Sequence, residues 1–294
     1  MDDLALPLTQ SEAFERTCAV LNVPVQRFDS AAGTCLVQSR KLPLLGPFHL
    51  ASRGPVFREG ADDPAWASAI KRALRGPLFV NAPLQAEGRG GPIGGWRLLG
   101  GAELAQVDLT EAVKMRGALH QKWRNQLKKA ESGPLRVIDQ PLDARKHAWF
   151  FEAEREQQKS RGYRAYPAAF LLAYAAANKG QARLYTALLG GQPVAAMLIL
   201  KHGRMATYQA GVTRAEGRKH CAHNLLLWRA MTDLNRKQYA VLDLGRADLS
   251  EGLRRFKSGT GARIQTLPGT YLLHSWVPGA SRKPASPRPI ISAQ

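Results

Sequence analysis

Cysteine is scarce in this chain of 294 residues, which contains only Cys18, Cys35 and Cys221. An odd, sparse set excludes the disulfide framework that stabilises many small secreted domains. Long apolar runs are lacking as well, since no window approaches the ~18 uninterrupted apolar residues of a membrane-spanning helix. The amino terminus has no basic segment followed by an apolar stretch, so we expect no secretory signal peptide. These absences predict a cytoplasmic protein without a membrane span.

Acidic residues are also few: 23 Asp and Glu stand against 42 Lys and Arg, which gives a net charge of +19. Such a field attracts polyanions and anionic small molecules. Nucleic acid, tRNA, a nucleotide-bearing cofactor and an anionic lipid surface all fit this charge. Because the excess is spread along the chain rather than concentrated in one run, a general solubilising charge is the other interpretation.

Three kinds of catalytic or binding motif are missing from the sequence. No Gly-x-Ser-x-Gly elbow occurs, which excludes that type of serine hydrolase. The glycine-dense stretch from Gly88 to Gly95 lacks the Gly-Lys-Ser/Thr ending of a P-loop, so we predict a flexible surface loop. His220, Cys221 and His223 lie close together, but no second ligand group follows at a usable spacing, and we predict no metal site.

The composition is that of a folded protein, with 45% hydrophobic residues, and the length favours two compact units. In the first 110 residues, short strand-like runs alternate with helical patterns. Ser11 is suited to cap the first of these helices. The elements expected in this part are helices at 11–22 and 64–74 and strands at 23–28, 34–39, 48–51, 77–81 and 105–109.

The clearest pattern is an antiparallel meander of strands at 182–189, 193–200 and 204–212, which are separated by glycine-containing turns. Val194 to Leu200 is uninterruptedly apolar, so we expect this strand to be central and buried on both faces. Around the meander we predict helices at 111–132 (with a break near Gly117), 143–161, 167–178, 222–236 and from Ser250, and strands at 135–138, 240–244 and 262–274.

The end of the chain, from Val277, is rich in Pro, Ser and basic residues. Such a segment cannot bury enough surface to offset its ordering entropy, so we expect a disordered tail. The sequence therefore predicts a first lobe over 1–110, a second lobe over 111–276 and a tail over 277–294.

The order of elements from 135 to 274 resembles that of a GNAT acyltransferase domain. In that family the acyl donor lies in a cleft between the last meander strand and the next strand, and the following helix points its amino terminus at the donor's phosphates. Unpaired N–H groups and the helix dipole suit such a site. The matching segment here holds three candidate donor-binding residues, Arg218, Lys219 and His220. It departs from the family's pyrophosphate signature, Gln/Arg-x-x-Gly-x-Gly/Ala, so acyl-CoA and aminoacyl-tRNA both remain candidate donors.

Two later segments, 242–246 and 252–262, are similar to the closing signature of FemAB-like transferases: an Asp-x-Gly strand end, then a Gly, then a Phe-Lys pair ahead of a Gly. Residues 123–125 (Trp-Arg-Asn) resemble the opening of their second lobe, and 53–55 (Arg-Gly-Pro) a turn in their first. The resemblance implies an α/β (α+β) fold of tandem GNAT-like lobes, each with a mixed, largely antiparallel sheet flanked by helices. It also implies a bacterial enzyme of cell-wall metabolism, with a degenerate first lobe on the acceptor side and a catalytic second lobe.

The resemblance assigns roles around the Phe-Lys pair. Lys257 matches the lysine with which FemAB relatives hold substrate phosphate or developing charge, and Phe256 and Gly259 flank it as substrate-binding candidates. Asp243 interrupts an apolar strand, and a buried carboxylate needs a partner. We expect it either to act structurally, as a cap or in an ion pair with Arg246, or to act as a base or substrate-orienting group.

Tyr208 is predicted to share one strand face with Ala206, Ala210 and Val212, where it projects either into a cleft or into the core. Arg124 and Arg246 are candidates for bidentate recognition of a phosphate or carboxylate, with an ordinary surface position as the alternative. The candidate catalytic residues are therefore Lys257, Tyr208 and Asp243.

The resemblance thus implies an N-acyltransferase in which an acceptor amine attacks an activated acyl or aminoacyl group directly, without a metal. In one version the donor is aminoacyl-tRNA and the acceptor a peptidoglycan precursor or a peptide. In the other the donor is an acyl thioester on CoA or a carrier protein. The alternative of another class is a catalytically inactive GNAT-like scaffold that binds nucleic acid or another polyanion. The sequence does not specify an oligomeric state.

Overall fold

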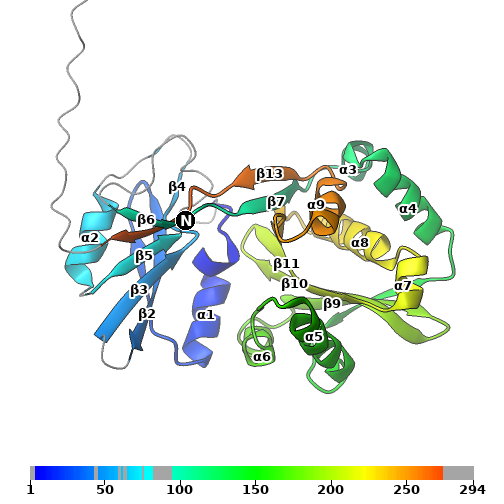
Figure 1. Ribbon diagram of the computed structural model, residues 1–294, viewed down its shortest axis with the longest axis horizontal. Coiled ribbons are helices and arrows are strands. Elements are labelled where there is room, and N and C mark those ends of the chain that lie inside the picture. Colours follow the sequence, from blue (N-terminus) through cyan, green and yellow to red (C-terminus); the bar gives the residue numbers. More distant parts are fainter. Residues whose placement is uncertain are drawn as a thin grey trace, which may run out of the picture.

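Figure 1 shows the computed structural model of the chain, in which two lobes lie side by side, each built on one sheet. The structure describes residues 4–42, 46–58, 61, 65–74, 76–81 and 95–273. Except for Gly95, the loop predicted at Gly88–Gly95 lies outside these residues, as does the tail predicted at 277–294. Within the described residues both sheets are mixed, each has seven strands, and helices flank them, so the predicted tandem α/β (α+β) fold is confirmed.

The first-lobe sheet has the strand order β1-β2-β3-β5-β14-β6, with the short β4 paired to β2. Only the pair β3–β5 is parallel among its described pairings. Helix α2 covers one face and packs Ile70 against Val37 and Val80. The bounds are η1 Leu8–Gln10, α1 Glu12–Val20, β1 Val25–Asp29, β2 Gly33–Leu42, β3 Gly46–Ser52, β4 Val56–Phe57, α2 Trp66–Ala73, β5 Leu78–Asn81, β6 Trp96–Leu99 and β14 Thr270–Leu273.

The second-lobe sheet has the order β13-β7-β12-β11-β10-β9-β8, and its one parallel pair among those described is β11–β12. Helices α3, α4 and α8 pack on one face of this sheet, and α5 and α6 on the other. The bounds are β7 Glu103–Asp108, α3 Ala112–Ala118, α4 Gln121–Glu131, β8 Arg136–Pro141, α5 Ala148–Arg161, α6 Ala168–Ala177, β9 Ala182–Leu189, β10 Gln192–His202, β11 Met205–Thr213, α7 Ala215–Lys219, α8 Ala222–Arg236, β12 Val241–Arg246, α9 Glu251–Ser258 and β13 Arg263–Thr266.

Strand β10 lies in the interior of this sheet, as its apolar run predicts. Met197 and Ile199 join the core on the α8 side, whereas Leu198 and Leu200 join the core on the α6 side. The predicted meander β9–β10–β11 and the break between α3 and α4 are likewise confirmed.

Helix α1 lies between the two sheets (Figure 1). Ser11 caps it by accepting the N–H of Phe14, as predicted. Phe14 then packs against Phe170 of α6, with ring centroids 5.7 Å apart. This core cluster also contains Leu36 of β2 and Leu198 of β10, so a single hydrophobic core joins the two lobes.

The chain crosses between the sheets in a way that the pattern did not predict. Strand β7 precedes residue 110 yet pairs with β12 and β13 in the second sheet. The stretch 262–274 divides at Leu267–Gly269 into β13 of the second sheet and β14 of the first. Each sheet therefore includes one strand from the other side of residue 110. The lobe boundary near that residue remains a prediction.

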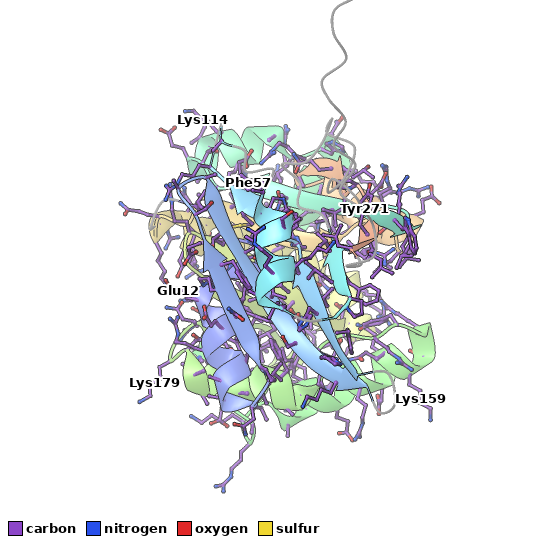
Figure 2. All side chains as sticks on the ribbon, turned by 90° about the vertical axis from the view of Figure 1, so that its left-hand side faces the viewer. Glu12, Phe57, Lys114, Lys159, Lys179 and Tyr271 are labelled. Carbon is purple, nitrogen blue, oxygen red and sulfur yellow. The ribbon has the colours of Figure 1, made fainter. Side chains whose placement is uncertain are left out.

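One helix begins later than predicted. Residues 143–147 form a turn, because the Asp143 carboxylate accepts the N–H groups of Arg145 and Lys146, and α5 starts only at Ala148. In the part of the chain that is described, no helix combines the length and the apolar character needed to cross a bilayer. In Figure 2, Lys114, Lys159 and Lys179 project outward at separate points of the rim, in keeping with a charge spread along the sequence.

Candidate functional site

The parallel strands β11 and β12 part in the middle of the second sheet. Their register runs from Met205↔Val241 to Thr207↔Asp243 and ends there, although β11 continues to Thr213 and β12 to Arg246. An opening at this point of the sheet is the feature that the GNAT resemblance predicts. We call it the split.

A β-bulge in β11 prepares one side of the split. Ile199 pairs with Tyr208 and Leu198 with Ala210, which leaves Gln209 as the extra residue. A bulge reverses the alternation of side chains, so Tyr208 packs on the α8 side whereas Ala210 and Val212 pack on the α6 side. The prediction that these residues share a face is therefore confirmed for Tyr208 with Ala206 and wrong for Tyr208 with Ala210 and Val212.

Gly211 leaves room for two side chains in the split. A Cβ at this position would lie 2.3 Å from Tyr208 Oη and 2.7 Å from His223 Nε2. His223, from the first turn of α8, also forms a short hydrogen bond with Thr213 Oγ1. Burial lowers the pKa of His223 to about 4, so its ring is neutral near pH 7.

Lys257 enters the split from α9, which Ser250 caps by accepting the N–H of Leu253. The lysine is only 5% exposed, and its Nζ donates to the carbonyl oxygen of Arg246 at 2.6 Å. The ammonium lies 6.0 Å from the centroid of the Tyr208 ring. Burial lowers the pKa of Lys257 to about 8, although the charges of Asp243 and Asp248 oppose this shift.

Helix α4 fixes the position of α9 through one tryptophan. Trp123 Nε1 donates to the carbonyl oxygen of Phe256 at 3.1 Å, and the two rings lie 6.1 Å apart. A Cβ on Gly259 would lie 2.7 Å from Trp123 Cδ1, so this close approach requires glycine. Phe256 and Gly259 thus contact Trp123, and their contacts hold Lys257 in place.

Asp243 is 1% exposed and pairs with a residue of the first lobe, Arg53. Its Oδ1 also accepts the N–H of Gly245 at 2.6 Å, where φ of 72° turns β12 away from β11. The predicted ion pair with Arg246 is wrong, because Arg246 donates to both oxygens of Asp248 at 2.9 Å. Asp243 and its partner come from positions 190 residues apart in the sequence.

A polar network forms the wall on the α5 side. Gln157 Nε2 donates to the carbonyl oxygen of Gly211 at 3.0 Å and to Tyr163 Oη at 2.9 Å. Tyr163 donates to Glu154 Oε1 at 2.9 Å, and burial raises the pKa of Glu154. Sequence reasoning missed this network. The available signal was the spacing of Glu154 four residues after Phe150, which places a carboxylate on the buried face of α5.

The residues predicted to bind the donor contact local partners instead of meeting at Lys257. Arg218 donates to the carbonyl oxygen of Thr213 at 2.7 Å, and Lys219 pairs with Glu216 at 2.6 Å. His220 is half-buried beside them. Arg124 is exposed and donates to the carbonyl oxygens of Gly117 and Leu119, where α3 ends.

A cavity of about 510 Å³ lies next to the split, between α5 and the end of β11. Arg214 lines it and stacks on Trp149, with its guanidinium carbon 5.7 Å from the ring centroid. Gln157 also lines it, so the polar network connects the cavity with Gly211 in the split. Among the described residues, no group of His, Cys, Asp and Glu has the arrangement of a metal site.

Comparison with known proteins finds a family similarity within the second lobe. A family model described as an acetyltransferase (GNAT) domain matches residues 117–258. Among solved structures, FemX has a TM-score of 0.67 at 13% identity, covering 91% of this chain and 92% of its own. The C-terminal domain of a putative lysylphosphatidylglycerol synthetase from Agrobacterium fabrum has a TM-score of 0.58 at 16% identity, covering 90% of this chain and 87% of its own.

A third structure, L-PGS from Bacillus licheniformis, has a TM-score of 0.57 at 15% identity, covering 91% of this chain and 93% of its own. At these identities the likenesses show a common fold that extends over both lobes. A search of curated protein sequences gives no match to the chain.

Proposed function

We propose that this chain, whose residues 117–258 match the model of an acetyltransferase (GNAT) domain, is a GNAT-type enzyme that transfers an acyl or aminoacyl group from an activated donor to an acceptor amine. The observation that carries the proposal is the buried ammonium of Lys257 beside Tyr208, in the split between β11 and β12. In the proposed reaction the amine attacks the donor carbonyl directly, without a covalent enzyme intermediate.

Direct attack places a negative charge on the carbonyl oxygen. A hydrogen-bond donor that is held in place in a water-poor site stabilises that charge. Lys257, with a pKa of about 8, is mostly protonated near pH 7 and can donate to the oxyanion. Tyr208 is the second donor in this proposal, because burial raises the pKa of its phenol and keeps the O–H intact.

The attacking amine must also lose a proton. We assign this step to Glu154, acting through the hydroxyl of Tyr163 on the α5 wall. Because burial raises the pKa of Glu154, its carboxylate is a stronger base than an exposed one. Gln157 orients the pair by donating to Tyr163 and to the backbone beside Tyr208.

We assign aminoacyl-tRNA as the donor. The net charge of +19 favours a polyanion, and the segment after β11 departs from the CoA signature of the family. Lys219 already pairs with Glu216, which leaves less cationic charge there for a pyrophosphate. The proposed acceptor is the amine of a peptide or a peptidoglycan precursor, which would place the enzyme in the bacterial cytoplasm at the start of cell-wall assembly.

The test compares two donor panels. Purified protein is incubated with radiolabelled acyl-CoAs and, separately, with tRNA charged with radiolabelled amino acids, each with a mixture of peptide and cell-wall amines. We expect label in the acceptor from charged tRNA only, and loss of that transfer when RNase is added beforehand. Transfer from acyl-CoA that resists RNase would contradict the tRNA assignment while retaining the acyltransferase.

Lys257→Met should reduce this transfer on the order of 10²–10³-fold, because one oxyanion donor is lost. The matched control is Lys201→Met, since Lys201 is also buried but lies 6.0 Å from the ring of Tyr239 instead of Tyr208. Full turnover by Lys257→Met would remove Lys257 from the catalytic site. Salt-dependent RNA binding without transfer from any donor would favour the inactive scaffold.

A further inference from the structure

A residue of the first lobe reaches the split. Arg53 follows β3, and its φ of 55° lies in the left-handed region, where a non-glycine residue is uncommon. Its guanidinium pairs with Asp243 of β12, and the two side chains are only 17% and 1% exposed. Strained backbone and a buried ion pair both cost free energy, so their combination at one residue points to a function.

The pair leaves Asp243 with both carboxylate oxygens occupied. Oδ2 accepts from Arg53, and Oδ1 accepts from the N–H of Gly245. Lys257 lies across the same turn, with Nζ 3.9 Å from the point where a Cβ on Gly245 would be. Its ammonium donates to the carbonyl oxygen of Arg246, and within the described residues it pairs with no carboxylate.

We propose that Arg53 is a positioning residue: by occupying Asp243 it keeps the ammonium of Lys257 off that carboxylate and directed into the split beside Tyr208. The role of Arg53 in turnover rests on the proposed function, whereas its effect on Lys257 is a property of the folded chain. The first lobe then serves the reaction through one side chain.

Several charged and titratable groups face this arrangement. Lys257 itself faces Asp243 and Asp248 from β12 and the residues after it, and Tyr208 from β11. His202 of β10 lies within the field of Asp243 and Arg53, and burial lowers its pKa to about 4, so it is neutral. On the α8 side, the neutral His223 contacts Phe256.

The charges around Lys257 predict opposite shifts for two substitutions. Arg53 offsets the negative charge of Asp243, so Arg53→Met should strengthen the negative field at Lys257 and raise its pKa. Asp243→Asn should leave the guanidinium of Arg53 as an uncompensated cation and lower the pKa of Lys257. A general loss of packing would instead shift the pKa of Lys257 in the same direction in both variants.

The experiment is an NMR titration of the full chain labelled at the lysine Cε carbons, with the Lys257 signal assigned from its absence in Lys257→Met. We expect the Lys257 midpoint to lie about one pH unit or more above the wild-type value in Arg53→Met and below it by a similar amount in Asp243→Asn. The double variant should fall between the two, and Arg53→Lys should remain near the wild type because it keeps the charge.

The matched control is Arg27→Met, which removes another first-lobe arginine paired with a carboxylate, Glu15, at 2.7 Å. It should leave the Lys257 midpoint unchanged. Unchanged midpoints in Arg53→Met and Asp243→Asn, or shifts of one sign in both, would overturn the proposal. If Arg53→Met fails to fold, the other two variants provide the test. A lower midpoint in Asp243→Asn with an unchanged midpoint in Arg53→Lys would support the proposal, and any other result would overturn it.

The titration needs no substrate, so its outcome is separate from that of the transfer assay. Opposite midpoint shifts together with full turnover by Lys257→Met would support the positioning by Arg53 and contradict the proposed function. Where transfer is measured, the alkaline limb of kcat should follow the Lys257 midpoint in each variant. A limb that stays fixed while the midpoint moves would contradict the catalytic part of the role.

Discussion

Each lobe has one parallel strand pair in its described sheet, and the two pairs end differently. In the first lobe, β3 and β5 stay in register up to Ser52↔Asn81, the last residue of each strand. In the second lobe, β11 and β12 stay in register only to Thr207↔Asp243, although both strands continue. The parallel pair β3–β5 is therefore hydrogen-bonded up to the ends of its strands, whereas β11 and β12 separate before theirs.

The difference comes from two local features of the second lobe. The bulge at Gln209 redirects β11, and the left-handed Gly245 redirects β12. The register of β3 with β5 contains no such shift. The pair β3–β5 leads directly into Arg53, whose side chain pairs with Asp243 at the edge of the split. The first lobe therefore reaches the split through the contact of Arg53 with Asp243.

Filling the split should cause the largest loss of activity. In Gly211→Val, the new side chain would displace Tyr208 and His223, and we expect transfer to fall about 100- to 1000-fold, or ~3–4 kcal/mol in activation free energy. Steady-state kinetics measure the loss. Gly252→Ala is the control, because a Cβ there has nothing within 4 Å. Equal activity of both variants would show that the split is not the reacting site.

The pH dependence of stability measures how completely Lys257 is buried at the split. The pKa of Lys257 falls from 10.5 to about 8 on folding. Between these values the unfolded lysine binds more protons than the folded one, so the free energy of unfolding rises with pH. The wild type should gain about 3 kcal/mol over this window relative to Lys257→Met. Urea unfolding at a series of pH values measures it, and a constant difference would contradict the burial.

The smallest effect on stability is expected from a substitution in the parallel pair β3–β5 of the first lobe. Val80 of β5 is fully buried, so Val80→Ala should lower the free energy of unfolding by about 2 kcal/mol. Because β3 and β5 frame no split, kcat of the folded variant should equal that of the wild type. Denaturant unfolding and kinetics at a temperature where the variant stays folded provide the two readouts. A reduced kcat would show that the first-lobe sheet acts on the site beyond the contact of Arg53.

Local patterns predicted much of this architecture, because they report burial along one segment. The apolar run Val194–Leu200 indicated a strand buried on both faces, and β10 is one. The Phe256-Lys257 pair likewise indicated a side chain anchored by its neighbour, and Trp123 contacts that neighbour. Both patterns are local in the sequence, although the partner that anchors Phe256 lies 133 residues away.

The errors concern features that distant residues decide. The partner of Asp243 was expected three residues away at Arg246, but it is Arg53, 190 residues away in the sequence. The bulge at Gln209 occurs at a residue with no turn chemistry of its own, so the alternation in β11 gave the wrong face for Ala210. Whether Arg218, Lys219 and His220 bind a donor stays a prediction, since their contacts in the folded chain are local.

The crossing of β7 and β14 between the sheets has a consequence for dissecting the protein. A cut near residue 110 would separate β7 from β12 and β13, its two neighbours, and leave β14 detached from β5 and β6. Neither fragment would contain a complete sheet, and each would expose backbone N–H and C=O groups that are paired in the intact chain. We therefore expect neither fragment to fold independently, because each would lack a strand of its sheet.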